Sequence, residues 1–118
     1  MEEISPPPPI KDFKEISGRI KQMSVNKQSS KQLQQFFPTC SSEIVDSILQ
    51  EIQDDLIFMT TDNYSNYSLS SLFKNCTSHQ RLFIINNIRD SMHIIARNKK
   101  GTHCLQNLIS LIETKEEE

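Results

Sequence analysis

The sequence predicts an all-α solenoid of stacked three-helix repeats, and three observations support this fold class. The segments that begin at Ser30, Asn66 and Thr102 align with a fixed step of 36 residues. A period of roughly 20–50 residues is typical of stacked supersecondary units. Glycine is scarce, with two among 118 residues, which favours helices over a turn-rich β protein. Five columns at this step are also apolar in all three copies: Ile20/Leu56/Met92, Met23/Met59/Ile95, Leu33/Leu69/Leu105, Phe36/Leu72/Leu108 and Phe37/Phe73/Ile109.

The chain divides into three parts by composition. Residues 1–17 include Pro6 to Pro9 and are expected to form a disordered, proline-rich segment that leads into the repeats. A docking motif for a protein partner is the less favoured alternative for this segment. An acidic tail follows at residues 113–118, where a third helix or a polar cap is expected. The chain is therefore expected to be part of a longer protein, with a short natural protein as the alternative. The repeats fill residues 18–112, at about 18–53, 54–89 and 90–112, and the third copy is incomplete.

Each repeat is expected to contain three short helices. The first carries apolar residues at helical spacing, beginning around Ile20 in the first copy. The second is expected to begin near Ser30, Asn66 and Thr102, because a serine or asparagine oxygen can accept from a free backbone N–H at a helix start. Pro38 should end the second helix of the first copy, since proline cannot continue a helix.

The third helix is expected to begin near Ser41 and Thr77. Thr77 and Gln80 have the spacing of a capping box, in which each side chain bonds to the other residue's backbone N–H. The buried face of this helix should hold apolar residues at helical spacing: Ile44, Ile48, Leu49 and Ile52 in the first copy, and Ile84, Ile85 and Ile88 in the second.

Charge is distributed unevenly along the chain. The net charge is −2, but residues 18–112 contain ten basic and seven acidic residues, so the repeat region is mildly basic between acidic ends. This permits RNA binding without demonstrating it. No apolar run approaches the roughly 18–20 residues of a membrane helix, and the N-terminus does not resemble a secretory leader.

The cysteine pattern indicates reduced thiols. Cys40 and Cys76 are 36 residues apart, at the same position of the repeat, so the repeat explains their spacing better than a disulfide does. We therefore expect a cytoplasmic protein, with the nucleus or nucleolus as the alternative location.

No pattern in the sequence predicts an enzyme, a cofactor or a small-molecule substrate. Cys76 and His79 are close, but no second pair completes a zinc site, so no metal is expected. Cys104 lies among expected core positions, with neither a base nor an orienting carboxylate placed beside it. Glycine-rich phosphate loops are absent from the sequence.

A polar pattern recurs at the first, second and fifth positions of each second helix. The first and fifth positions lie on the same helical face, one turn apart, and the second lies about 100° round the helix. Two side chains can therefore reach one base edge while the third lies against the flat of a base. Stacked repeats align these groups along one surface, at about one base per repeat.

These motifs resemble the Pumilio (PUF) family of RNA-binding repeats over roughly residues 18–112. The resemblance implies a right-handed, armadillo-type superhelix that binds single-stranded RNA. It further implies recognition of messenger RNA 3′ untranslated regions and control of translation or stability. The matching segments are Gly18-Arg19-Ile20, Ser30-Lys31-x-x-Gln34, Met59 to Tyr67, Thr77 to Arg81 and Lys100-Gly101-Thr102-His103-x-x-Gln106.

The resemblance also assigns roles to individual residues. The first trio matches the adenine type, with Lys31 in place of arginine, and lysine has no planar fork to stack on a base. The second matches the uracil type, with Ser70 in place of glutamine, and the third is a looser match. Because the family binds RNA antiparallel, a U-A step is implied. The implied base-edge residues are Ser30, Gln34, Asn66, Ser70, Thr102 and Gln106, and the implied stacking residues are Lys31, Tyr67 and His103.

A second hypothesis comes from a different class of protein. Repeats of this type that have lost base readout would form a helical-repeat adaptor that binds protein partners, for example on the convex face. The two hypotheses differ in the salt dependence of binding and in competition by RNA over DNA.

Overall fold

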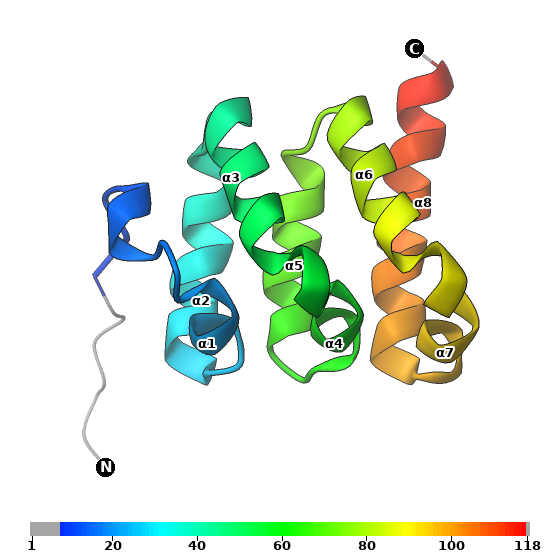
Figure 1. Cartoon of the computed structure of the whole chain (residues 1–118), viewed down its shortest axis with the longest axis horizontal. Helices are drawn as coiled ribbons and strands as arrows, with labels where there is room; N and C mark the ends of the chain where they lie inside the picture. Colours follow the sequence, from blue (N-terminus) through cyan, green and yellow to red (C-terminus); the bar gives the residue numbers. More distant parts are fainter. Residues whose placement is uncertain (1–7, 118) are drawn as a thin grey trace.

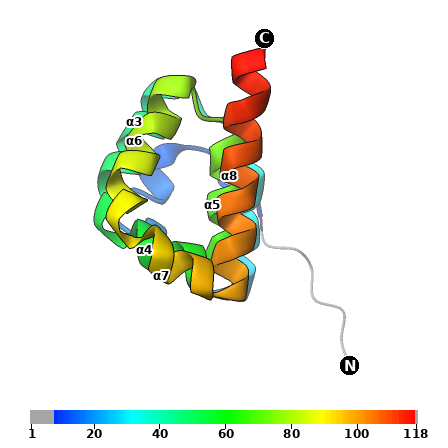
Figure 2. The ribbon, with the colours of Figure 1, turned by 90° about the vertical axis from the view of Figure 1, so that its right-hand side faces the viewer.

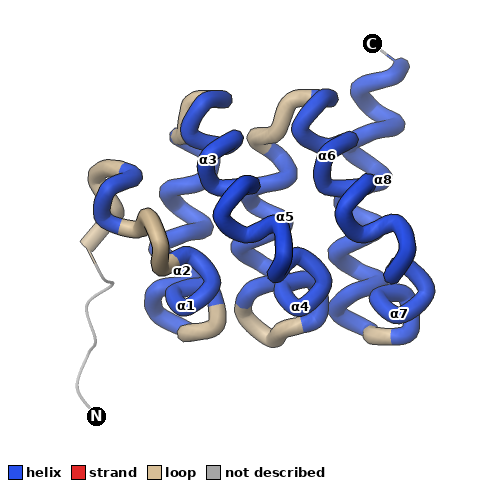
Figure 3. The backbone as a smooth tube through the Cα atoms, viewed as in Figure 1, coloured by secondary structure: helices blue, strands red, loops and turns tan. Residues whose placement is uncertain are grey.

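The computed structural model describes residues 8–117, and this part of the chain is built from helices and short loops, with no strand (Figure 3). Repeat 1 contains α1 (Ile20–Ser24), α2 (Lys27–Phe36) and α3 (Ser42–Ile52). Repeat 2 contains α4 (Leu56–Thr61), α5 (Ser65–Lys74) and α6 (Ser78–Ile88). Repeat 3 contains α7 (Met92–Arg97) and α8 (Lys99–Glu117). Four 3₁₀ helices join or precede them: η1 (Phe13–Glu15), η2 (Phe37–Thr39), η3 (Gln53–Asp55) and η4 (Arg89–Ser91).

The repeats stack side by side into a short solenoid. The second helices α2, α5 and α8 form one layer, and the third helices α3 and α6 form the opposite layer (Figures 1 and 2). The first helices α1, α4 and α7 close one end between the two layers. The predicted all-α solenoid of three-helix repeats is thereby confirmed. None of the helices in residues 8–117 is both long and apolar enough to span a membrane.

Side-chain caps fix where the helices begin. The capping box expected at Thr77 and Gln80 is confirmed, with N···O distances of 2.9 and 3.1 Å. Ser41 caps α3 as expected, and α2 ends at Phe36, just before Pro38. The start of α2 differs from the expected Ser30, because Asn26 accepts from two backbone N–H groups and starts the helix earlier.

Five apolar columns supply most of the core. Their members are buried in repeats 1 and 2, apart from the half-buried Met23. The buried face of the third helices differs slightly from the expected one. Val45 is fully buried although it was not expected to be, and Ile44 and Ile85, which were expected to be buried, are half-buried. Repeat 3 is more open, since the exposed fraction of Ile109 is 46%.

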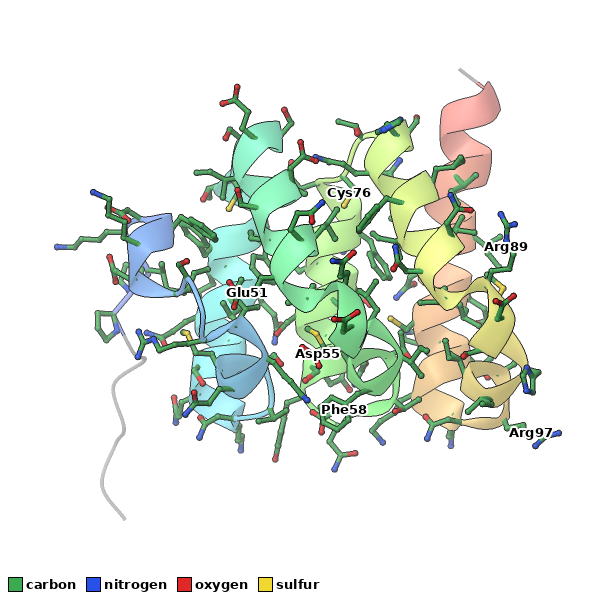
Figure 4. The ribbon with its side chains drawn as sticks, viewed as in Figure 1. Glu51, Asp55, Phe58, Cys76, Arg89 and Arg97 are labelled. Carbon is green, nitrogen blue, oxygen red and sulfur yellow. The ribbon has the colours of Figure 1, made fainter. Side chains whose placement is uncertain are left out.

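The segment before repeat 1 covers its outer end. Residues 1–17 were expected to be disordered, but Asp12 caps the 3₁₀ helix η1, and Ile16 is fully buried. The carboxylate of Glu51 on α3 (Figure 4) then accepts from the backbone N–H of Gly18 at 2.8 Å and of Ile20 at 3.0 Å. Burial of apolar side chains against the first repeat explains this order. Residues 1–7, which include Pro6 and Pro7, lie outside the described residues.

The second helices are joined by a seam of side-chain hydrogen bonds between adjacent repeats. The hydroxyls of Ser30 and Ser68 are 2.9 Å apart, and both residues are buried. Ser71 donates to the backbone oxygen of Gln34 at 2.9 Å. Serine is short enough for α2 and α5 to pack closely while every buried hydroxyl finds a partner.

The seam changes where repeat 2 meets repeat 3. Between repeats 1 and 2, Asn75 donates to the backbone oxygens of Phe37 at 2.9 Å and Cys40 at 2.8 Å. The equivalent residue one repeat later is Leu111, which has no amide to donate. The backbone oxygen of Phe73 instead accepts from the buried Arg81, at 3.2 Å from Nε and 3.1 Å from Nη2.

We predict that Asn75→Ala lowers the free energy of unfolding by about 1–3 kcal/mol, because it removes the amide that bonds two part-buried carbonyls. Urea denaturation followed by circular dichroism measures this change. Asn63→Ala, at an exposed asparagine in the α4–α5 turn, is the matched control and should cost less than about 0.5 kcal/mol. Equal losses for the two variants would contradict a structural role for the Asn75 amide.

Candidate nucleic-acid interface

Two adjoining grooves lie along the layer of second helices. Groove A has a volume of about 460 Å³ and groove B about 430 Å³, within the usual range of roughly 300–1,000 Å³ for ligand sites. Tyr67 and His103 line both grooves, so the two meet at these rings. Groove A is further lined by Asn66, Lys99, Lys100, Thr102 and Gln106, and groove B by Gln34, Ser70, Ser71, Lys74 and Asn107.

The start of α5 places Asn66 and Tyr67. The carboxylate of Asp62 accepts from the backbone N–H of Tyr64 and of Ser65, both at 3.0 Å. Asn66 is 2% exposed, and its amide nitrogen donates to the backbone oxygens of Asp62 at 2.6 Å and Asn63 at 3.1 Å. Tyr67 points outward, with 55% of its surface exposed.

The tight turn between α7 and α8 places Thr102 and His103. Asn98 accepts from the backbone N–H of Gly101 at 2.9 Å, and the Thr102 hydroxyl donates to the backbone oxygen of Ala96 at 2.7 Å. A Cβ on Gly101 would lie 2.4 Å from the backbone oxygen of Ile95, so only glycine allows this approach of the two helices. His103 follows directly and is exposed.

The first trio of the repeat pattern is placed differently from the other two. Ser30 is 1% exposed and belongs to the seam, where it also donates to the backbone oxygen of Tyr64 at 3.1 Å. Gln34 lines groove B, and its amide lies 3.3 Å from the Ser30 hydroxyl. Lys31 is exposed and lines neither groove. The roles of Ser30 and Lys31 in base recognition stay predictions.

The grooves group residues across repeats. Groove A combines Asn66 of repeat 2 with Thr102 and Gln106 of repeat 3. Groove B combines Gln34 of repeat 1 with Ser70 of repeat 2 and Asn107 of repeat 3. The linear sequence indicates which trios repeat, but not that neighbouring trios share a groove.

Charge differs between the second helices and the third helix of repeat 1. The helices α2 and α5 and residues 99–112 of α8 contain no acidic residue and five lysines: Lys27, Lys31, Lys74, Lys99 and Lys100. The segment formed by α3 and η3 contains no basic residue and five acidic ones: Glu43, Asp46, Glu51, Asp54 and Asp55. The third helix of repeat 2, α6, contains one arginine and no acidic residue. The second helices around the grooves therefore suit an anionic partner, and α3 does not.

Sequence reasoning did not assign Lys74, Lys99 or Asn107 to the site. Lys74 follows Ser70 by four residues and Asn107 follows His103 by four, so each lies one turn further along the same helical face. Helical spacing from the predicted stacking and edge residues was the signal that could have found them.

Cys104 lies beneath the grooves and is fully buried. Its sulfur is 3.8 Å from the Ser70 hydroxyl and 4.0 Å from the backbone oxygen of Asn66. Burial raises the pKa of Cys104 to about 11, against a smaller opposing effect of the Ser70 hydrogen bond. Burial likewise raises the pKa of Cys76 to about 12. Among the described residues, no group of three or more histidine, cysteine or acidic side chains could hold a metal ion.

Comparison with solved structures shows that the chain has a Pumilio-like repeat fold. It is similar to the Puf3 RNA-binding domain bound to the Cox17 RNA 3′ UTR recognition sequence site B, with a TM-score of 0.79 and 20% identity, over 86% of this chain and 29% of that one. It is also similar to the Puf4 RNA-binding domain bound to the HO endonuclease RNA 3′ UTR recognition sequence, with a TM-score of 0.78 and 19% identity, over 83% of this chain and 31% of that one.

A third similar structure is PUF-8 in complex with PBE-RNA, with a TM-score of 0.76 and 17% identity, over 83% of this chain and 28% of that one. The chain thus spans less than a third of each of these three chains. No protein-family model matches the sequence, and no curated protein matches it significantly.

We predict that a thiol reagent at pH 8 labels Cys40 in the folded protein and leaves Cys76 and Cys104 unlabelled. Burial excludes the reagent from both, and their raised pKa values keep the thiolate fraction small at this pH. Mass spectrometry before and after denaturation measures the number of labels. Cys40→Ser should carry no label until it is unfolded. Labelling of Cys104 as fast as Cys40 would contradict the buried position beneath the grooves.

Proposed function

We propose that this chain binds single-stranded RNA along the layer formed by α2, α5 and α8. The observation that carries the proposal is the pair of exposed rings, Tyr67 and His103, on neighbouring helices with a polar groove on either side. Unstacked bases bind to aromatic faces, and base edges bind to amides and hydroxyls beside them. The geometry supplies both kinds of surface in one place.

Three lysines surround the grooves and suit the phosphates of the strand. Lys99 and Lys100 line groove A, and Lys74 lines groove B, while no acidic residue lines either groove. Phosphate contacts position a nucleic acid without reading its sequence. Single-stranded RNA therefore fits better than a neutral peptide as the ligand of this layer.

The similar structures support the finer part of the proposal. Two of them are RNA-binding domains bound to recognition sequences from RNA 3′ untranslated regions. By analogy, we propose messenger RNA 3′ untranslated regions as the target, with control of translation or stability in the cytoplasm as the role. Asn66 and Tyr67 match the uracil-type pattern, so a U-A step is the expected sequence element.

We predict that Tyr67→Ala weakens binding to a short labelled RNA containing a U-A step by about 1–3 kcal/mol, because one stacking surface is lost. Fluorescence anisotropy measures the dissociation constant. Leu82→Ala is the matched control, since Leu82 is also 55% exposed but lies on α6 in the opposite layer. Equal weakening by both variants would contradict a binding surface on the second helices.

We predict that Lys99→Gln and Lys100→Gln each reduce the salt dependence of binding. Removing one phosphate contact should lower the slope of log K against log salt concentration by about 0.7. Anisotropy titrations over a series of salt concentrations measure the slope. Arg89→Gln removes one positive charge from η4 (Figure 4) and should leave the slope unchanged.

Failure of the unsubstituted chain to bind any RNA at low salt would overturn the proposed function. Binding to a protein ligand that RNA does not displace would instead support the helical-repeat adaptor. Binding to RNA and DNA with equal affinity and no base preference would reduce the site to a general basic surface.

A further inference from the structure

Repeat 2 departs from its neighbours at one position that lines groove B. Gln34 and Gln106 occupy the fifth position of the polar pattern in repeats 1 and 3, whereas repeat 2 has Ser70. The Ser70 hydroxyl lies 3.8 Å from the sulfur of Cys104 and accepts from the amide of Asn107 at 3.3 Å. Repeat 2 therefore offers groove B a short hydroxyl that is already bonded, where the other repeats have a carboxamide.

Asn107 comes from repeat 3, and its equivalents are Gln35 in repeat 1 and Ser71 in repeat 2. The residue at this position in repeat 2 is Ser71, whose hydroxyl is used in the seam, where it donates to the backbone oxygen of Gln34. The Asn107 side chain is longer and reaches the Ser70 hydroxyl across the same junction, while it also lines groove B. The half-buried carboxamide of Asn107 therefore lies in groove B beside Ser70, the position at which repeat 2 has no carboxamide.

We infer that Asn107 is a base-selecting residue of groove B and replaces the carboxamide that repeat 2 lacks at Ser70. This inference rests on the proposed RNA-binding function. The hydrogen bond to Ser70 uses one amide N–H and orients the group, which leaves its carbonyl oxygen as an acceptor and its second N–H as a donor.

The groove also indicates the chemical class of the base. Lys74 lines the same groove and can only donate, so an ammonium donor accompanies the Asn107 acceptor. Uracil and guanine present a carbonyl oxygen next to a ring N–H and match this pair. Tyr67 and His103 supply aromatic faces for the base. Groove B is therefore assigned to a keto base.

The test measures base preference with a panel of short RNAs in which each position in turn carries each of the four bases. Asn107→Ser gives repeat 3 the residue that repeat 2 has at the same position, Ser71. The substitution should therefore be compatible with the packing between the second helices. The unsubstituted chain should prefer uracil or guanine at one position by at least about fivefold. Asn107→Ser should abolish that preference and keep the preferences at other positions.

A compensating change separates a direct role from a structural one. Groove B keeps the carboxamide of Gln34 in every variant. Ser70→Gln in the Asn107→Ser background returns a second carboxamide to the repeat 2 side of the groove, and the keto preference should return. Asn87→Ser, at an exposed asparagine on α6, is the matched control and should leave all preferences unchanged. Thermal unfolding of each variant shows that the fold is retained.

The outcomes distinguish this inference from the function on which it rests. An unsubstituted chain that binds no RNA overturns both. RNA binding with the same base preferences in Asn107→Ser overturns the inference alone, and so does a preference for adenine or cytosine at the position that Asn107→Ser affects.

Discussion

The close packing of the second helices is the constraint on which the rest of the structure depends. Buried serines and the half-buried Asn75 of one repeat bond to hydroxyls and backbone oxygens of the previous repeat, as Ser68 does to Ser30 and Asn75 does to Phe37. An unpaired buried polar group costs about 1–3 kcal/mol, so these bonds fix the register between repeats. The register in turn sets which side chains share a groove, and it places the Tyr67 and His103 rings on adjacent helices.

The same constraint explains why the two junctions differ. Leu111 cannot replace the Asn75 amide, and Arg81 takes the Phe73 oxygen from within its own repeat. One nitrogen of Arg81, Nη1, is buried without a hydrogen-bond partner, which marks this junction as the less satisfied one. Groove A lies at this junction, whereas groove B reaches from Gln34 of repeat 1 to Asn107 of repeat 3 and so spans both junctions. The junction with more hydrogen bonds therefore holds the stack, and the less satisfied junction takes part in both grooves.

Much of the fold could be predicted from the sequence because its determinants are local or periodic. The apolar columns and the Thr77–Gln80 capping box depend on residues at fixed spacing, and both are observed. The start of α2 at Lys27 was missed because the cap lies four residues before the polar trio, at Asn26. This cap also repeats at a step of 36 residues, since Asp62 and Asn98 accept from backbone N–H groups at the equivalent positions. The order of residues 8–17 depends on packing against repeat 1, and the shared grooves depend on contacts between repeats. Both involve residues far apart in the sequence, and a pattern along the chain does not reveal which of them meet.

Hydrogen bonds within and between the repeats also set the free-energy cost at which a side chain could bond to a base under the proposed function. Asn66 would have to give up bonds to the Asp62 and Asn63 oxygens to donate to a base, and leaving such oxygens unpaired costs about 1–3 kcal/mol. The Ser30 hydroxyl is likewise bonded to the backbone oxygen of Tyr64 and to the Ser68 hydroxyl. The exposed amide of Gln106 requires no such exchange. Under the proposed function, base selection should therefore depend more on exposed residues such as Gln106 than on the buried residues that define the repeat pattern.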